Sequence, residues 1–153
     1  MSLYFPIVSK RGDTWKLVVL TKQLITKSSE RRQLIDLTSE VTRFVHETNV
    51  REGICIVSVP HATAALIVNE HEAGLLNDLL AKIEALFPES APYDHNAIDD
   101  NADAHVAATF LGHNRTFPVS HGKLIRGTWQ NLFLVELDGP RSRREVVVQV
   151  IGD

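Results

Sequence analysis

The last third of the chain places the strongest limit on the fold. Strand-like apolar runs follow one another at 115–120, 131–137 and 143–151, and the turn sequences HGK and DGP lie between them. Residues 123–130 (KLIRGTWQ) are expected to add a further strand. Strands joined by short turns pair antiparallel, because a parallel connection needs a crossover of a dozen or more residues. The sequence therefore predicts a long antiparallel ending.

The first two thirds of the chain mix strand and helix patterns. We expect strands at 14–26, 31–37, 50–59 and 61–70, and helices at 38–49, 72–88 and 102–112. The second helix carries an apolar stripe of Leu75, Leu76, Leu79, Leu80, Ile83, Leu86 and Phe87. This order predicts an α+β fold, a compact single domain over 1–153 with a mostly antiparallel sheet or sandwich and about three helices.

Two of the expected helices carry end signals or an expected buried face. Thr38 or Ser39 is expected to cap the first helix, and Gly112 is expected to end the third. The inward stripe expected on the third helix consists of Ala102, His105, Val106, Thr109 and Phe110.

Composition excludes several classes of protein. The net charge is −3, which does not favour a general nucleic-acid binder. No apolar run approaches the roughly 20 residues that cross a membrane, and no signal-peptide pattern is present. The single cysteine, Cys55, rules out an intrachain disulfide and is expected to be a buried structural thiol. We therefore expect a cytoplasmic protein with no nucleic-acid or membrane partner.

Three of the seven histidines stand apart from the rest. His61 follows an apolar strand, His95 lies in a polar loop, and His105 lies on the expected inward stripe. Each alone is typical of a histidine hydrogen-bonded near the core. Together, three neutral imidazoles suit zinc with a fourth position open for water. The remaining histidines are expected to be solvated surface residues, namely His46, His71, His113 and His121.

Charged residues at two positions have more than one interpretation. Glu70 ends a strand, where it suits a general base, a metal ligand or a charge at the start of the next helix. Arg141, Arg143 and Arg144 follow the DGP turn. Guanidinium groups there suit phosphate or carboxylate, and equally a charged edge that blocks strand aggregation. Near the expected last hairpin, Trp129 suits the core or an interface and Gln130 suits a pocket wall.

The stretches HATAALIVNE, YDH, NADAHVAATFLG and GKLIRGTWQNLFLVELDGPRSRREVVVQV together resemble the YjbQ-like family, over about residues 14–151. Members of that family are often labelled secondary thiamine-phosphate synthase. The resemblance implies a compact α+β fold, a homotrimer and one polar pocket with a bound metal. It departs at NEHEAG, where the family often has Asn-Glu followed soon by Asp-Pro. Cys55 is not part of the family pattern.

Together, these features predict an enzyme that acts on a small phosphorylated metabolite. The expected roles are catalysis by Glu70 and His61, substrate binding by Asn69, Trp129, Gln130, Arg143 and Arg144, and metal binding by His61, His95 and His105. The reaction would be a thiamine-phosphate synthase-like transfer, which ordinarily uses magnesium on oxygen ligands, or a metal-assisted hydrolysis, which fits zinc on imidazole. One alternative is a non-catalytic trimeric module that binds a metal, an anion or a metabolite. Another is that the polar residues mainly hold the trimer together.

The distance between the two expected catalytic residues bears on where the site lies. Nine residues of straight strand would separate His61 from Glu70 by about 30 Å. One chain alone would then not bring both to a single small ligand. We therefore expect a site near a subunit interface, with contributions from two chains.

Overall fold

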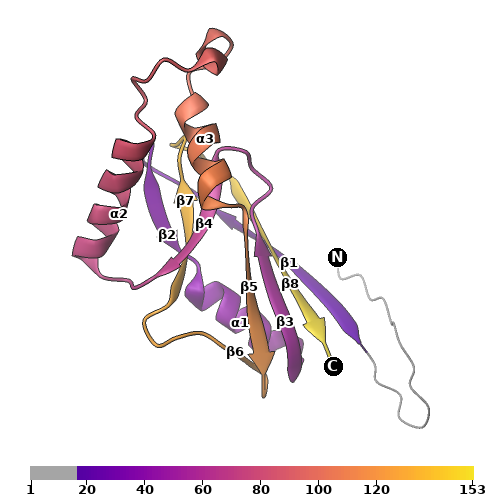
Figure 1. Cartoon of the computed structure of the whole chain (residues 1–153). Coiled ribbons are helices and arrows are strands. Elements are labelled where there is room, and N and C mark those ends of the chain that lie inside the picture. Colours follow the sequence, from indigo (N-terminus) through magenta and orange to yellow (C-terminus); the bar gives the residue numbers. More distant parts are fainter. Residues whose placement is uncertain (1–16) are drawn as a thin grey trace.

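Two antiparallel sheets form the framework of the structure (Figure 1). The computed structural model describes residues 17–153, so positions 14–16 of the first predicted strand, and the start of the expected 1–153 domain, lie outside the described residues. The larger sheet has the order β1 (Val18–Thr26), β8 (Arg144–Gly152), β3 (Glu52–Ser58), β5 (Asn114–Ser120) and β6 (Lys123–Leu124). The smaller has the order β2 (Gln33–Asp36), β7 (Asn131–Glu136) and β4 (Ala64–Asn69).

Three α-helices complete the fold, as the sequence predicts: α1 (Thr38–Thr48), α2 (Ala73–Leu86) and α3 (Ala102–Leu111). A short 3₁₀ helix, η1 (Asp94–Ala97), lies between α2 and α3. The main core contains side chains of α1 and of both sheets. A second core cluster joins α2 and α3 to strands β4 and β7 of the smaller sheet. The predicted compact α+β fold with mostly antiparallel sheets is therefore confirmed.

Strands β7 and β8 show how burial shapes the sequence. Helices α2 and α3 cover one face of β7 and the main core covers the other, so residues 132–136 are all buried and read as a continuous run. Only one face of β8 is covered, and its burial alternates residue by residue. The DGP segment between them bends the chain from the smaller sheet to the larger one, so β7 and β8 do not pair with each other as a continuous antiparallel ending would require.

The inward stripe predicted for α3 is wrong at Thr109 and Phe110, which are exposed, and is confirmed at Ala102, which is buried. The helix buries Ala102, Asp103, Ala104, Ala107 and Ala108, whereas Phe110 is 77% exposed. Alanine faces the sheet because its small side chain lets the helix approach Ala65 of β4, which lies in the same core cluster. Phe110 is therefore left on the outer side of the helix, whereas Leu111 packs against the second core cluster. Gly112 ends α3 with a positive φ, as predicted.

The apolar stripe of α2 is only partly covered. Among its residues only Ile83 is buried, and Leu86 at the end of the helix is 63% exposed. Its neighbour Phe87 contacts Phe110 of α3, with ring centroids 5.5 Å apart. In the loop between the helices, Ile98 is 86% exposed. An isolated chain thus presents large apolar side chains on its helical side.

Two local predictions differ from the structure. Neither Thr38 nor Ser39 caps α1, because the cap position is Leu37 and Thr38 is the first helical residue. The Thr38 hydroxyl instead accepts a hydrogen bond from the backbone N–H of Leu132, at 2.9 Å, and ties the helix to β7. The strand predicted at 123–130 is limited to Lys123–Leu124. No helix within residues 17–153 has the length and apolar character needed to cross a membrane.

Candidate functional site

A fully buried carboxylate at the end of β7 lies at the centre of the polar interior. Glu136 is 0% exposed, and it meets Arg144, the first residue of β8, which is 5% exposed. The guanidinium donates from Nε to Oε2 at 2.7 Å and from Nη2 to Oε1 at 2.5 Å. Such a two-point contact fixes the orientation of both groups. The start of β8 is thereby held against the end of β7.

Several further donors complete the hydrogen bonding of Glu136. The Ser28 hydroxyl donates to Oε2 at 2.8 Å, and the backbone N–H groups of Leu137 and Asp138 donate to Oε1 at 3.0 and 2.9 Å. Burial raises the pKa of Glu136, but the hydrogen bonds from Arg144, Asp138 and Ser28 outweigh it and hold that pKa below the usual range. Glu136 is therefore ionised at neutral pH. It is a structural anion rather than a proton donor.

Gly139 allows the β7–β8 turn to approach this pair closely. A Cβ atom at this position would lie 2.1 Å from the backbone oxygen of Glu30 and 2.9 Å from Cγ of Glu136. Any larger residue would therefore push the turn away from the buried carboxylate.

His61 lies at the edge of the same region, with one ring nitrogen fixed. The backbone N–H of Glu145 donates to His61 Nε2 at 2.8 Å, so the neutral ring carries its proton on Nδ1. Burial lowers the pKa of His61, and the charge of Arg144 lowers it further, while Glu145 and Glu136 act in the opposite direction. The ring is thus a neutral hydrogen-bond donor. This geometry suits anion binding better than metal binding through Nε2, and the roles predicted for His61 stay predictions.

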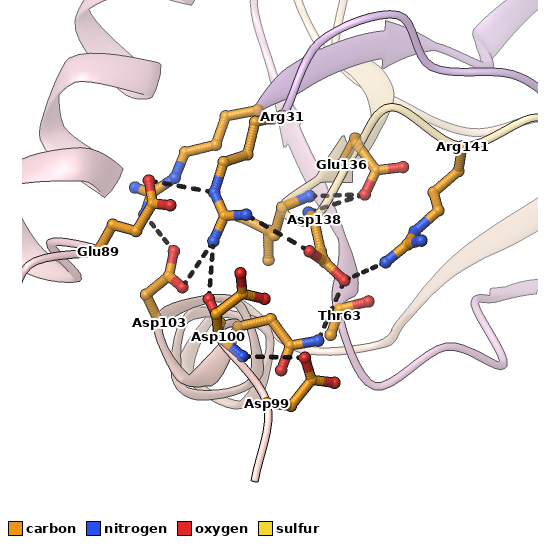
Figure 2. Close-up of polar contacts among 12 residues, drawn as sticks. Arg31, Thr63, Glu89, Asp99, Asp100, Asp103, Glu136, Asp138 and Arg141 are labelled. Carbon is orange, nitrogen blue, oxygen red and sulfur yellow. Dashed lines mark hydrogen bonds and ion pairs between the residues drawn. The ribbon is translucent and has the colours of Figure 1, made fainter. Parts of the chain in front are cut away.

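A second ionic network connects this region to the helices (Figure 2). Asp103 of α3, which is 1% exposed, accepts from Arg31 at 3.0 Å and from Arg32 at 2.6 Å. Asp138, in the β7–β8 turn, accepts from Arg141, and it lies 3.6 Å from Arg31. The network joins the segment before β2, the start of α3 and the β7–β8 turn. The position of α3 relative to the turn is fixed by these charges.

Of the three histidines predicted to share a site, His95 and His105 lie together, whereas His61 forms no group of three with them within residues 17–153. The ring centroids of His95 and His105 are 5.0 Å apart in an edge-to-face arrangement. His95 belongs to η1 and His105 to the first turn of α3. Residues 17–153 contain no group of three His, Cys, Asp or Glu that could hold a metal ion within one chain. The two imidazoles could supply two ligands, so a complete zinc site would need a donor from another chain, and the predicted metal stays a prediction.

Predicted site residues also gather at the opposite end of the β4–β7 pair. β4 pairs with β7 from Ala64–Glu136 at one end to Asn69–Asn131 at the other. We name these the Glu136 end and the Asn131 end. The side chain of Asn69 accepts from the backbone N–H of Glu70 at 2.9 Å. The Glu70 carboxylate makes no hydrogen bond or ion pair with any residue of 17–153.

Gln130 and Trp129 belong to the loop that leads into the Asn131 end. The Gln130 side-chain oxygen accepts from the backbone N–H of Gly127 at 2.7 Å, and Arg126 donates to the Gln130 backbone oxygen at 2.5 Å. These contacts close a short loop on which Trp129 is 70% exposed. An indole that is exposed in this way is available to a ligand or to a second chain.

The structure therefore divides the predicted site residues into three groups within one chain, one of which is the pair His95 and His105 at η1 and the start of α3. His61, Arg143 and Arg144 lie at the Glu136 end. Asn69, Glu70, Trp129 and Gln130 lie at or next to the Asn131 end.

Sequence reasoning missed His71, which was expected to be a solvated surface histidine. Its Nδ1 lies 2.6 Å from Oδ2 of Asp36, the last residue of β2. The only signal in the sequence was the closeness of His71 to Asn69 and Glu70. The pairing with Asp36 depends on how β2 and β4 flank β7, which spacing alone does not reveal.

Comparisons with known proteins agree on one family. The model of the family described as UPF0047 protein YjbQ-like matches residues 22–153. A UPF0047 protein of Methanothermobacter thermautotrophicus is 45% identical over 134 residues, which are 88% of this chain and 93% of that protein. A crystal structure from Sulfolobus solfataricus, described as a YbjQ-like protein of unknown function, has a TM-score of 0.89 and 47% identity over 90% of this chain and 99% of that one. A hypothetical protein of Aeropyrum pernix has a TM-score of 0.84 and 38% identity over 87% of this chain and 98% of that one.

We expect Glu136→Gln to lower the free energy of unfolding by about 3–5 kcal/mol at neutral pH, because it leaves Arg144 buried without a carboxylate. Urea denaturation of the folded chain measures this. Replacing both residues by Met should be less destabilising than Glu136→Gln. As a control, Glu47→Gln removes the exposed pair with Lys22 and should change stability by less than about 1 kcal/mol.

The same variant has a defined pH dependence. The pKa of Glu136 is lower in the folded chain than its ordinary value of 4.5. Its contribution to the free energy of unfolding is therefore fully present above pH 4.5 and is lost as pH falls through the lower folded pKa. The difference in the free energy of unfolding between wild type and Glu136→Gln should therefore become smaller in acid. A difference that stays constant from neutral pH into strong acid would contradict this assignment.

Proposed function

Because the chain belongs to the YjbQ-like UPF0047 family, we propose that it is an enzyme for a small phosphorylated metabolite, with an active site completed where two copies meet. The observation that carries this proposal is the division of the site residues between the two ends of β4. Five steps of strand separate Ala64 from Asn69, which is roughly 17 Å. That is too far for one small metabolite to contact both groups. A cyclic assembly solves this, because the Glu136 end of one chain can meet the Asn131 end of the next.

The two ends offer complementary chemistry. The Glu136 end presents donors in the form of arginine side chains and His61 Nδ1–H, which suit an anion. The Asn131 end presents the Glu70 carboxylate, which is unpaired within residues 17–153, and side-chain amides. A phosphate held at the first end would place the rest of the metabolite near the second. In this arrangement Glu70 acts as the general acid or base.

The arginines at the Glu136 end differ in availability. Arg144 is engaged by Glu136 and Thr63, so it positions the site rather than binding phosphate. Arg141 and Arg143 have side chains that are 48% and 58% exposed, and each forms an ion pair with one carboxylate, Asp138 or Glu145. A guanidinium has five N–H donors, so both retain donors for a phosphate. We therefore add Arg141 to the predicted phosphate-binding residues.

The apolar helical side supports assembly. Leu86, Ile98 and Phe110 are 63%, 86% and 77% exposed in one chain. Large exposed apolar patches mark interaction sites on soluble domains. His105 and Phe110 both lie on α3, and His95 lies on η1 just before it. An interface on this side would therefore bring a second chain close to both imidazoles. The family resemblance implies a homotrimer, and we propose that state.

A metal fits the proposed site only in the assembled protein. Two neutral imidazoles suit zinc better than magnesium, which prefers oxygen ligands. A zinc ion bound there with an open position would lower the pKa of its water and favour hydrolysis. Transfer chemistry of the thiamine-phosphate synthase kind, in which a thiazole nitrogen displaces pyrophosphate, remains the second reaction to assay because of the family resemblance.

We expect Phe110→Glu to break the assembly. A charge cannot be buried unpaired in an apolar interface without a large penalty, so the variant should become monomeric or much weaker in self-association. Sedimentation velocity of the full chain measures this. Ile25→Glu is the matched control, because Ile25 is 46% exposed but lies on β1 rather than on the helices. Wild-type protein that is monomeric at all concentrations would contradict the proposed site.

Phosphorylated compounds should stabilise the protein through Arg141 and Arg143. A thermal-shift series with inorganic phosphate, pyrophosphate and a panel of sugar, nucleoside and heteroaromatic phosphates tests this. Arg143→Gln should reduce the shift, whereas Arg43→Gln on the exposed side of α1 should not. Release of phosphate or pyrophosphate then separates an enzyme from a binding module. A phosphorylated ligand that binds both Arg143→Gln and Arg141→Gln as tightly as it binds wild type would contradict the phosphate site.

Elemental analysis tests the metal. Purified untagged wild type should carry zinc, and a His95→Ala/His105→Ala variant that keeps its fold and assembly should lose it. Wild type that takes up no zinc after incubation would rule out these ligands. The two histidines would then be anion-binding or proton-transfer groups.

A further inference from the structure

We infer that Asp36 and His71 form a proton-accepting pair at the Asn131 end, with His71 Nε2 as the atom that takes the proton. The inference depends on the proposed function only in placing a substrate near this end of the sheet. It assigns the base to a histidine that neither the motif pattern nor the family resemblance singled out.

The carboxylate of the pair is held by several donors. Asp36 Oδ2 accepts from the Asn131 side-chain amide at 3.1 Å and lies 2.6 Å from His71 Nδ1. Asp36 Oδ1 accepts from the backbone N–H of Thr38 at 2.8 Å. Partial burial raises the pKa of Asp36, but these hydrogen bonds outweigh it and keep that pKa below the usual range. Asp36 is therefore ionised at neutral pH and can only accept hydrogen bonds.

This geometry fixes the tautomer of His71. An ionised carboxylate has no proton to donate, so His71 Nδ1 must be the donor in the contact at 2.6 Å. The neutral ring then leaves the lone pair on Nε2 free. The ring also packs edge-on against Phe133, with centroids 5.3 Å apart, which restricts its rotation. Since the His71 side chain is 52% exposed, a ligand can reach it.

The surroundings distinguish this pair from an ordinary surface contact. Asn69 and Asn131 face each other across β4 and β7, and Glu70 is the residue before His71. The predicted site residues Asn69 and Glu70 therefore lie next to the pair, and Asn131 on the neighbouring strand binds Asp36 directly. By comparison, His121 is 80% exposed, and its Nδ1 lies 3.7 Å from Glu52 and donates or accepts only with its neighbour Ser120 at 3.0 Å. Asp36 is fixed by three partners, whereas the contacts of His121 are local.

The chemistry is that of an imidazole oriented by a carboxylate. Nε2 removes a proton from a water or hydroxyl group, and the oxygen of that group becomes the nucleophile. The imidazolium that forms is stabilised by Asp36, which itself stays unprotonated. The proton can then pass from Nε2 to the leaving group. The pair thereby replaces Glu70 as the acid–base group of the proposed function, and Glu70 is left to position the attacking group.

The first test measures the reactivity of Nε2 without any substrate. Diethyl pyrocarbonate acylates unprotonated imidazole nitrogen, and mass spectrometry of peptides gives the rate at each histidine. At mildly alkaline pH we expect His71 to react severalfold faster than His46 and His121, because the contact with Asp36 holds the ring proton on Nδ1 and leaves the lone pair of Nε2 exposed. Asp36→Asn should bring the rate at His71 close to that at His46. Equal rates in wild type, or a rate unaffected by Asp36→Asn, would overturn the inference.

The second test needs no variant, so a folding defect in Asp36→Asn does not leave the inference open. Nitrogen-15 NMR of the full wild-type chain reports which ring nitrogen of His71 carries the proton. We expect the Nδ1–H tautomer at neutral to mildly alkaline pH. A ring that is mainly Nε2–H would overturn the pair. Neither test depends on phosphate binding, Arg143 or assembly, so failure of the proposed function and failure of the pair are separable outcomes.

Discussion

The buried contact between Glu136 and Arg144 is the interaction on which the rest of the site depends. Both charges are removed from water, and such a pair is stable only when nearly every oxygen and N–H finds a partner. Here the partners come from the segment before β2, the loop before β4 and the β7–β8 turn. One ion pair therefore fixes the relative positions of segments that are far apart in the sequence.

Function follows from what this pair positions. Because Arg144 is held inward, the start of β8 is fixed, and this strand presents the backbone N–H of Glu145 to His61. The ring of His61 is thereby fixed in one tautomer by a strand whose place is set by Glu136. The Arg31–Asp103–Asp138 network extends the same rigidity to α3, which carries His105. A structural ion pair and the proposed ligand-binding groups thus belong to one connected arrangement.

The sequence predicted the periodic elements well because their burial is simple. The covered face of β8 and the doubly covered β7 leave direct traces in the apolar pattern. Prediction failed where size, rather than polarity, decides packing, as on α3, where alanines face the sheet and Phe110 faces out. It also failed for Thr38, whose hydroxyl serves β7 instead of its own helix. Contacts between β2 and the end of β4, such as Asp36 with His71, are set by sheet order, which no local pattern encodes.

The proposed site is incomplete in a single chain. A strand of six residues cannot bring its two ends together, and here each end carries only part of a plausible chemistry. The Glu136 end holds fixed donors and cations, and the Asn131 end holds the oriented imidazole of His71 and the carboxylate of Glu70. Joining them within one chain would require a bend that the continuous β4–β7 ladder forbids. Our proposal joins them between chains, and the exposure of large apolar residues on α2 and α3 favours contact with a second copy.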